Sequence, residues 1–393
     1  MAAGGSVVRQ ITAIPVSVPY LHRELSSVVA RDGVSDVVIR LETGDGAVGW
    51  GESCAGADTE SVVAAVKAMS VFAIGRSCWD GERMRRDVMH HGLWQFREGT
   101  ANFAWAGIDM ALWDVCGKRA GLPVHQLLGG AIQDRVNYFW YLSWGDDASL
   151  AAQCAAGLAA GYDVFYLKVG IDISEDLHRV ATVRQELGPG ARLRIDANGA
   201  WSPSDAIRHL RALAQFDIDF VEQPVKESPP ELLRRLRDAS IVPVAANEGL
   251  WTEADAMTRI LADNADVYCF SPYWVGSLRG FQFLGTLAGR RGAAVCKHTH
   301  GELAIAAAAA HQVMLTLPAI VRGNQQTTAH MAEDVADSPL RHSPDWGVPD
   351  APGLGVDVDE GRLQEAAARY ARYGQFQPFQ LDELSARWKT GRE

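Results

Sequence analysis

Three short apolar segments, each ending in acidic or amide side chains, constrain this chain more than any other feature of its sequence. They read LRIDANG with Asp196, DFVEQP with Glu222, and PVAANEG with Asn247 and Glu248. Asp196 lies 26 residues before Glu222, and Glu222 lies 26 residues before Glu248. An interval of that length holds one strand, one helix and two loops, so the spacing indicates three successive βα units.

The acidic groups in these segments predict a cation site. Because the carboxyl ends of neighbouring parallel strands meet at one edge of a sheet, Asp196, Glu222 and Glu248 would converge and repel one another. All of the offered ligand atoms are oxygens, which favours Mg²⁺, with Mn²⁺ as a possible substitute. The alternative is that these residues are solvated loop acids or helix N-caps. Three of them in register favour a site.

Composition narrows the function classes. The chain has 393 residues, 48% of them apolar and 22% charged, with a net charge of −11. The negative charge argues against nucleic acid or an anionic membrane as a partner. The sequence shows no secretory leader and no run of 18 apolar residues, so we expect a cytoplasmic protein. Six scattered cysteines without a CxxC pair predict buried free thiols.

The first part of the chain predicts an α+β domain. Residues 7–50 read as strands, with a hairpin turn at 44–46 and a loop at 20–33. Residues 58–70, 80–95 and 100–120 show helical spacing of apolar residues.

From about residue 136 the pattern changes to a repeat, in which short apolar runs alternate with amphipathic helices at intervals of roughly 23 to 28 residues. The eight runs are VNYFWYL, VFYLKV, LRID, IDFVE, VPVAAN, DVYCF, AAVCK and PAIVR. This repeat predicts an α/β fold with a parallel (β/α) barrel. We place the first domain at residues 1–130 and the barrel at 131–339, with residues 340–393 packing back on the first domain.

Barrel enzymes carry their chemistry at the carboxyl ends of the strands. The polar or aromatic residues at those ends are Tyr141 or Trp144, Lys168, Asp196, Glu222, Asn247 with Glu248, Ser271, His298 and Asn324.

The sequence resembles the enolase superfamily, in the branch of mandelate racemase and muconate lactonizing enzyme. The resemblance covers nearly the whole chain and rests on the segments GIDMALWDVCGKRAGLPVHQLLGG, YLKVG, RIDANGAW, FVEQP, PVAANEG, HTHGE and PGLGVDV. It implies an α+β capping domain, completed by the C-terminal segment, that closes over a modified TIM barrel. It also implies that Mg²⁺ holds a substrate carboxylate while a base removes the neighbouring α-proton.

The resemblance also implies roles for single residues. Asp196 and Glu222 match metal ligands, and the third ligand is either Asn247 or Glu248. Lys168 matches the second lysine of a Lys-x-Lys motif and is the expected base, although a surface lysine is the alternative. A nearby cation should lower its pKa. Tyr166 replaces the first lysine and could tune Lys168 or donate to a substrate oxygen.

His298 matches the histidine that follows the seventh strand in the family. Its aspartate partner on the sixth strand is replaced by Ser271, so His300, Glu302 or Lys297 could serve instead. We also expect His22, Trp144, Ser271, His300 and Asn324 to contact substrate, although a packing role for His300 is the alternative.

These observations predict a Mg²⁺-dependent enzyme that acts on a small carboxylate. Among the reactions of such enzymes, dehydration of a sugar acid is our first expectation. Lys168 or His298 would remove the α-proton, and His298 could protonate the departing hydroxyl. A racemase, epimerase or cycloisomerase is one alternative, and a non-catalytic metal-binding member is another. The family resemblance leads us to expect a homo-oligomer.

Overall fold

The computed structural model describes residues 4–27, 29–54, 58–92, 95–96 and 99–377. Its N-terminal part is an antiparallel sheet of β1 (Val8–Leu25), β2 (Ala30–Thr43) and β3 (Val48–Ser53), in which Ile14 pairs with Val38 and Ile39 pairs with Gly51. The predicted hairpin turn at 44–46 joins β2 to β3. The predicted loop at 20–33 was wrong for most of its length, because Glu24 and Leu25 pair with Arg31 and Ala30 and extend the sheet after an irregular register at 19–24.

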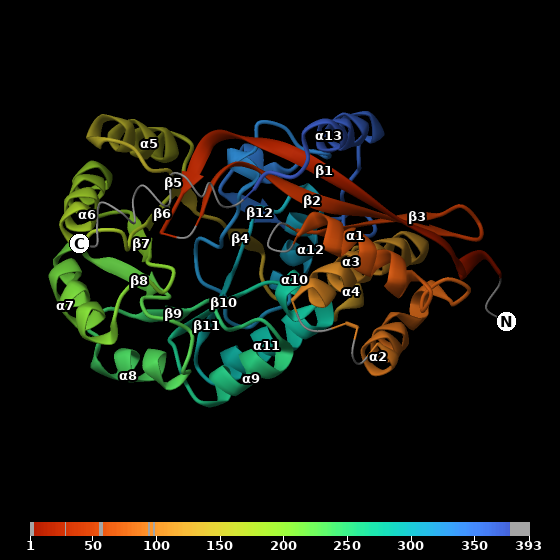
Figure 1. Ribbon diagram of the computed structural model, residues 1–393, viewed down its shortest axis with the longest axis horizontal. Helices are drawn as coiled ribbons and strands as arrows, with labels where there is room; N and C mark the ends of the chain where they lie inside the picture. Colours follow the sequence, from red (N-terminus) through yellow and green to blue (C-terminus); the bar gives the residue numbers. More distant parts are fainter. Residues whose placement is uncertain (1–3, 28, 55–57, 93–94, 97–98, 378–393) are drawn as a thin grey trace.

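Two helices, α1 (Thr59–Ser70) and α3 (Thr100–Ala120), pack on this sheet (Figure 1). The helices α2 (Gly81–His91) and α4 (Val124–Leu127) contact α3. The α3 helix is buried on almost every side, and it approaches β3 very closely. A Cβ atom on Gly51 would lie 1.9 Å from the carbonyl oxygen of Gly107, so only glycine allows strand and helix to meet at this distance.

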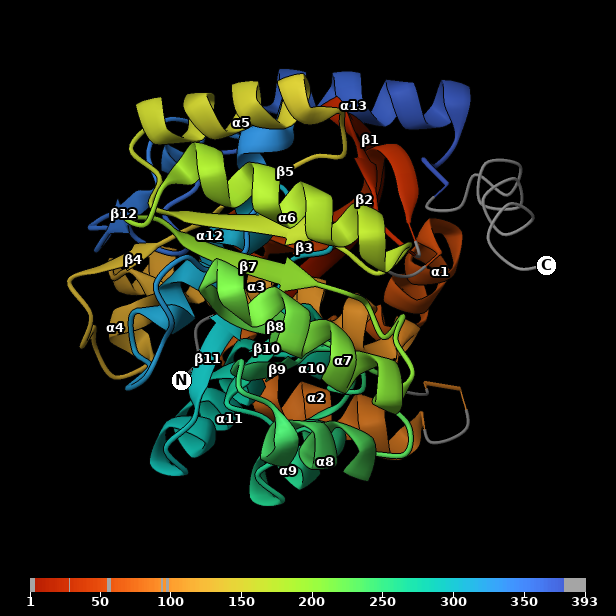
Figure 2. The ribbon, with the colours of Figure 1, turned by 90° about the vertical axis from the view of Figure 1, so that its left-hand side faces the viewer.

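A parallel sheet follows, with its strands hydrogen-bonded in chain order. The strands are β5 (Trp140–Leu142), β6 (Val164–Lys168), β7 (Arg192–Asp196), β8 (Ile218–Glu222), β9 (Val244–Ala246), β10 (Val267–Phe270) and β11 (Ala294–Lys297). The helices between and after them are α5 (Asp147–Ala159), α6 (Ile173–Leu187), α7 (Pro203–Leu213), α8 (Glu231–Ala239), α9 (Glu253–Leu261), α10 (Pro272–Val275), α11 (Leu278–Arg290) and α12 (Ala304–Met314). Figure 2 shows α5 to α8 lying along the outside of this sheet.

The sheet closes on itself without a regular eighth strand at the predicted PAIVR run. Single parallel bridges join Val295 to Ile320 and Tyr138 to Asn324. The buried guanidinium of Arg194 on β7 donates hydrogen bonds to the carbonyl oxygens of Arg322 and Gly323. The segment that closes the barrel is therefore held by two single bridges and by two hydrogen bonds from the Arg194 side chain.

The C-terminal part of the described chain returns to the N-terminal sheet. The helix α13 (Glu360–Tyr373) packs on β1, and Arg369 Nη1 donates to the carbonyl oxygen of Ser17 at 2.8 Å. A short strand, β12 (Asp345–Gly347), pairs antiparallel with β4 (Arg135–Asn137). The 3-10 helices are η1 (Gly4–Ser6), η2 (Cys78–Asp80), η3 (Ala214–Phe216), η4 (Thr328–His330) and η5 (Pro339–Arg341).

A buried carboxylate connects the N-terminal sheet to the barrel. Glu52 on β3 accepts hydrogen bonds from the backbone N–H groups of Leu303, at 2.8 Å, and Ala306, at 2.9 Å. These N–H groups lie at the N-terminus of α12 and have no partner within the helix, so the Glu52 side chain supplies their acceptors. Glu52 is fully buried, so the contact forms part of the interface core.

The six cysteines all lie in the described ranges and are buried and free, as predicted. Within those ranges, every helix is too short or too polar to cross a lipid bilayer.

Candidate active site

A cavity of 450 Å³ lies where the N-terminal sheet covers the carboxyl ends of the barrel strands. Its barrel side is formed by Lys168, Asn198, Asn247, Glu248, Trp251, Trp274, His298, Thr299 and His300, and its other side by Glu24, Ser26, Val29, Arg31, Val34, Ser35, Asp58, Thr59 and residues 375–377. A smaller cavity of 40 Å³ shares Glu24, Arg31, Lys168 and Thr299 with it and adds Tyr166 and Gln325. Because they share these four side chains, the two cavities are neighbours, and together they make up the candidate site.

Lys168 and Asp196 meet at the mouth of the barrel because they are register partners at the ends of β6 and β7. Lys168 Nζ lies 2.7 Å from Asp196 Oδ2 and 3.1 Å from Asn198 Oδ1. Tyr166 points to the same face of β6, since alternate residues of a strand share a face. Its hydroxyl donates to Asp196 Oδ2 at 2.5 Å.

The charges around Lys168 hold its ammonium form. Burial lowers its pKa, but the carboxylates of Asp196, Glu222 and Glu24 outweigh that effect, so the pKa is raised. The expected lowering depends on a cation, which would act against these carboxylates.

Two further carboxylates stand close to Asp196. Asp196 and Glu222 are register partners on β7 and β8, and Glu222 accepts from Gln325 Nε2 at 3.0 and 2.7 Å. Burial and repulsion from Asp196 raise the pKa of Glu222 well above its ordinary value, and they raise the pKa of Glu248 to about 7. These shifts indicate that ionising the three acids together is unfavourable while no cation is bound.

The side chains present fit a hard divalent cation by their chemistry. The candidate ligands are all oxygens, they repel one another, and Glu248 Oε2 is a buried acceptor that has no hydrogen-bond partner in the described part of the chain. In their present conformations, no three His, Cys, Asp or Glu side chains of the described residues surround a single point. The fit therefore rests on the donor set and on the unpartnered oxygen.

Asn247 and Glu248, the two candidates for a third ligand, face different neighbours. Glu248 Oε1 accepts from Asn198 Nδ2 at 2.9 Å. After burial, repulsion from Asp196 is the next largest cause of the raised Glu248 pKa. Asn247 turns toward β10 and β11, where its Nδ2 lies 3.0 Å from the carbonyl oxygen of Cys269 and 2.9 Å from His298 Nδ1.

His298 follows β11 and has an aromatic environment. Its ring centroid lies 4.3 Å from that of Trp274 and 4.6 Å from that of His300. Burial, His300, Lys168 and Lys297 lower the pKa of His298 well below its ordinary value. Burial and Arg31 lower the pKa of His300 to about 3. Both histidines are therefore neutral at pH 7.

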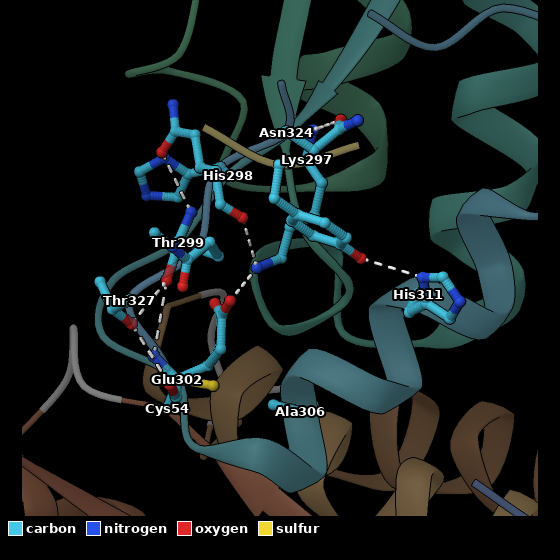
Figure 3. A network of polar contacts seen from close by, with 12 residues as sticks. Cys54, Lys297, His298, Thr299, Glu302, Ala306, His311, Asn324 and Thr327 are labelled. Carbon is cyan, nitrogen blue, oxygen red and sulfur yellow. Dashed lines mark hydrogen bonds and ion pairs between the residues drawn. The ribbon is translucent and has the colours of Figure 1, made fainter. Parts of the chain in front are cut away.

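Two of the expected partners of His298 are paired with each other. Lys297 and Glu302 form a buried ion pair, and Lys297 Nζ also donates to the carbonyl oxygen of Gln325 at 3.0 Å. Figure 3 shows Lys297 and Glu302 pointing toward one another, with the His298 ring directed away from them. Tyr273 ties the segment together, because its hydroxyl donates to the carbonyl oxygen of His298 at 3.0 Å.

Two family descriptions match the chain. Residues 11–129 match the mandelate racemase / muconate lactonizing enzyme N-terminal domain, and residues 149–362 match the enolase C-terminal domain-like family. The chain belongs to the enolase superfamily, in its mandelate racemase and muconate lactonizing enzyme branch. The resemblance inferred from the sequence motifs is thus confirmed.

Individual members of this superfamily show the same relationship. The chain is 31% identical to D-galactarolactone cycloisomerase of Agrobacterium fabrum over 85% of its own length and 92% of that protein. It is 32% identical to muconate cycloisomerase 1 of Pseudomonas putida over 69% of its length and 72% of that protein.

A solved structure confirms the fold class. Muconate lactonizing enzyme of Pseudomonas fluorescens, in complex with muconolactone, superposes with a TM-score of 0.86 and 27% identity, over 92% of this chain and 99% of that one. The predicted modified TIM barrel with an α+β capping domain is therefore confirmed. Since these relatives are enzymes acting on small molecules, this member of the superfamily is an enzyme as well.

The structure brings some of the predicted substrate-contacting residues into the site. His300 lines the larger cavity and His22 lines the smaller one.

It does not bring Trp144, Ser271 or Asn324 there. The ring of Trp144 lies 3.8 Å from the guanidinium carbon of Arg179, so this aromatic group belongs to the outer βα layer. Ser271 is fully buried at the start of α10. Asn324 bonds to the backbone of Asn137, Lys297 and Val321 and holds the barrel closure.

The sequence reasoning missed Glu24 and Arg31, which line both cavities. Arg31 Nε donates to Glu24 Oε2 at 2.7 Å, and its Nη2 donates to the carbonyl oxygen of His300 at 2.6 Å. Both residues lie in the stretch that the sequence indicated as a loop, and their charged side chains gave no sign that they would be held inward by each other.

Proposed function

We propose that this protein abstracts the proton α to the carboxylate of a small hydroxy acid, with Lys168 as the base, and that the net reaction is dehydration of a sugar acid. The observation that carries the proposal is the placement of Lys168 Nζ in the cavity, 2.7 Å from Asp196. A base must reach the α-proton of the substrate. A positive charge near the substrate carboxylate makes that proton more acidic, because it stabilises the negative charge that builds up when the proton leaves.

Asp196, Glu222 and Glu248 are the proposed ligands of Mg²⁺, which Mn²⁺ could replace. Glu248 is preferred over Asn247 because its Oε2 lacks a hydrogen-bond partner among the described residues, whereas the Asn247 amide contacts Cys269 and His298. When bound, the cation would stabilise the negative charge that builds on the substrate carboxylate and would offset the carboxylates that hold Lys168 protonated.

The remaining steps belong to residues of this chain. Lys168 takes the α-proton, and Tyr166 fixes the position of Asp196 beside it. Loss of the β-hydroxyl as water then requires a proton, and both His298 and the protonated Lys168 face the cavity. The C–H and C–O bonds break, an enol forms, and its tautomerisation gives a 2-keto-3-deoxy acid.

A mixed library of sugar acids in D₂O containing Mg²⁺ tests the proposal. We expect a 2-keto acid product and an α-proton loss that disappears when a chelator is added. Recovery of every acid without deuterium at the α-carbon would contradict it.

Cycloisomerisation is the second candidate, supported by the relatives named as cycloisomerases. It begins with the same proton chemistry at Lys168 and ends with a ring opened or closed. Adding aldaric acids and their lactones to the library distinguishes the two, because a lactone that interconverts with an open acid without yielding a keto acid identifies a cycloisomerase.

A further inference from the structure

The side-chain amide of Asn247 can adopt only one orientation. Its Nδ2 lies 3.0 Å from the carbonyl oxygen of Cys269, and a carbonyl oxygen only accepts hydrogen bonds. Turning the amide over would place two acceptors against each other. The NH₂ group therefore faces Cys269, and the same NH₂ group lies 2.9 Å from His298 Nδ1.

This orientation decides which nitrogen of His298 carries the proton. Because Asn247 Nδ2 is a donor, Nδ1 has to be the acceptor and cannot bear a hydrogen. The neutral ring then carries its single proton on Nε2. A doubly protonated ring would set two N–H groups against each other, so the imidazolium form is opposed by the same contact.

The surroundings of the ring support this assignment. Trp274 and His300 pack against it. Burial, together with His300, Lys168 and Lys297, keeps its pKa low, and a side-chain contact with Gln325 acts in the opposite direction. Its Nε2 is buried and has no hydrogen-bond partner within the described ranges, although His298 lines the 450 Å³ cavity. An N–H donor is thus held ready for an acceptor from outside the protein.

We propose that Asn247 is a positioning residue that locks His298 as the neutral Nε2–H tautomer, so that His298 donates a hydrogen bond to a substrate oxygen and does not act as a base. The inference rests on the proposed function and deepens it. A neutral histidine can stabilise developing negative charge on an oxygen without giving up its proton.

The chemistry then uses a single base. Lys168 takes the α-proton and becomes an ammonium group. The β-hydroxyl then receives this proton from Lys168 and leaves as water, which returns the lysine to its neutral form. The Nε2–H bond of His298 stays intact throughout. A one-base site moves protons on one face of the α-carbon, so it favours dehydration or cycloisomerisation and disfavours racemisation of enantiomers.

Nitrogen NMR on the Mg²⁺-loaded enzyme with ¹⁵N-labelled histidine tests the tautomer directly. His298→Asn identifies the His298 signals by their loss. We expect Nε2 protonated and Nδ1 unprotonated, with no change over the range in which an ordinary histidine titrates, about pH 5.5 to 7.5. A proton on Nδ1, or a ring that titrates in that range, would overturn the inference, and this readout does not depend on activity.

Asn247→Asp provides the second test. A carboxylate at this position accepts a hydrogen bond, so the proton should move to Nδ1, and the His298 pKa should rise. The freed Nε2 lone pair should add slow α-deuterium exchange in the α-epimer of the substrate. Unchanged ring signals in a folded Asn247→Asp enzyme would contradict the proposal.

Asn264→Asp is the matched control. Asn264 is equally buried and donates to the carbonyl oxygen of Pro230 at 3.1 Å, so the same isosteric change is made away from His298. Its His298 signals should match the wild type. Failure of Lys168→Ala to abolish exchange would remove the proposed function, whereas the ring signals bear on Asn247 and His298 alone.

Discussion

Tyr166 and Asp196 are joined by a hydrogen bond of 2.5 Å that connects two neighbouring strands, and Tyr166 lines the smaller cavity. The tyrosine stands at the position where the family pattern has a lysine, so a neutral donor replaces a cation beside the carboxylate. Asp196 keeps its partner, and Lys168 remains the cation that contacts it.

Tyr166→Phe should weaken the fold without disturbing the ring packing. A hydrogen bond to a charged group contributes about 1.5–3 kcal/mol, and the stacked contact with Phe139, at 4.7 Å between ring centroids, would remain. Urea unfolding measures the loss. Tyr162→Phe is the control, because Tyr162 packs against Trp140 before β6 begins. Equal losses in the two variants would show that the bond to Asp196 adds nothing.

Lys168→Met should reduce α-proton exchange of an active substrate by 10²–10⁴-fold, the usual contribution of a general base. The reason is that no other amine lies as close to Asp196 in the cavity-lining set. Exchange is followed by proton NMR in D₂O. Lys67→Met, on the exposed face of α1, should keep the wild-type rate, and a Lys168→Met enzyme that does the same would show that another group is the base.

Glu248→Gln should stabilise the metal-free protein increasingly as pH rises. The folded-state pKa of Glu248 is about 7, above its ordinary value of 4.5, so the folded protein holds this proton more tightly than the unfolded chain. Wild-type stability therefore falls as pH rises from about 4.5 to about 7. The neutral variant avoids this loss, by roughly 3 kcal/mol at pH 8.

Chemical denaturation at several pH values in the presence of a chelator measures that difference, with the exposed Glu365→Gln as control. Added Mg²⁺ should then raise the stability of the wild type more than that of Glu248→Gln, because binding to the native state stabilises it by mass action. A Glu248→Gln benefit that does not vary with pH would contradict the assignment.

Glu52→Gln should loosen the contact between the N-terminal sheet and α12. One of its two accepting oxygens would become an NH₂ group facing the N–H of Leu303 or Ala306, and a buried unsatisfied donor costs about 1–3 kcal/mol. Hydrogen exchange at these two amides should accelerate, as measured by mass spectrometry. Glu42→Gln on the neighbouring strand, where the partner is the half-buried Arg40, should leave them unchanged.

The sequence allowed much of the barrel and its acidic groups to be predicted, because that information is local. Asp196 and Glu222 each end an apolar run, and strand ends in a parallel sheet have only one place to converge. The PAIVR run has the same appearance as a strand. It forms only a single bridge at Ile320, and Arg194, far away in sequence, bonds to the carbonyl groups of Arg322 and Gly323 at its end.

Other features depend on contacts that no local pattern reveals. The partner of His298 could not be predicted, because Asn247, Cys269 and His298 come from the ends of three strands. Residues 20–25 looked irregular because their polar side chains break the alternation, yet Glu24 is held inward by Arg31 across the turn. Trp144 was expected to contact substrate because it follows the first barrel strand, but its ring lies against the guanidinium group of Arg179.

The carboxylate of Glu52 also bears on how a substrate could enter. Swinging the N-terminal sheet away from the barrel would remove both backbone donors from that buried carboxyl group and expose the first N–H groups of α12. Such a hinge motion would cost much free energy, so a substrate should enter while the N-terminal sheet and the barrel stay in contact.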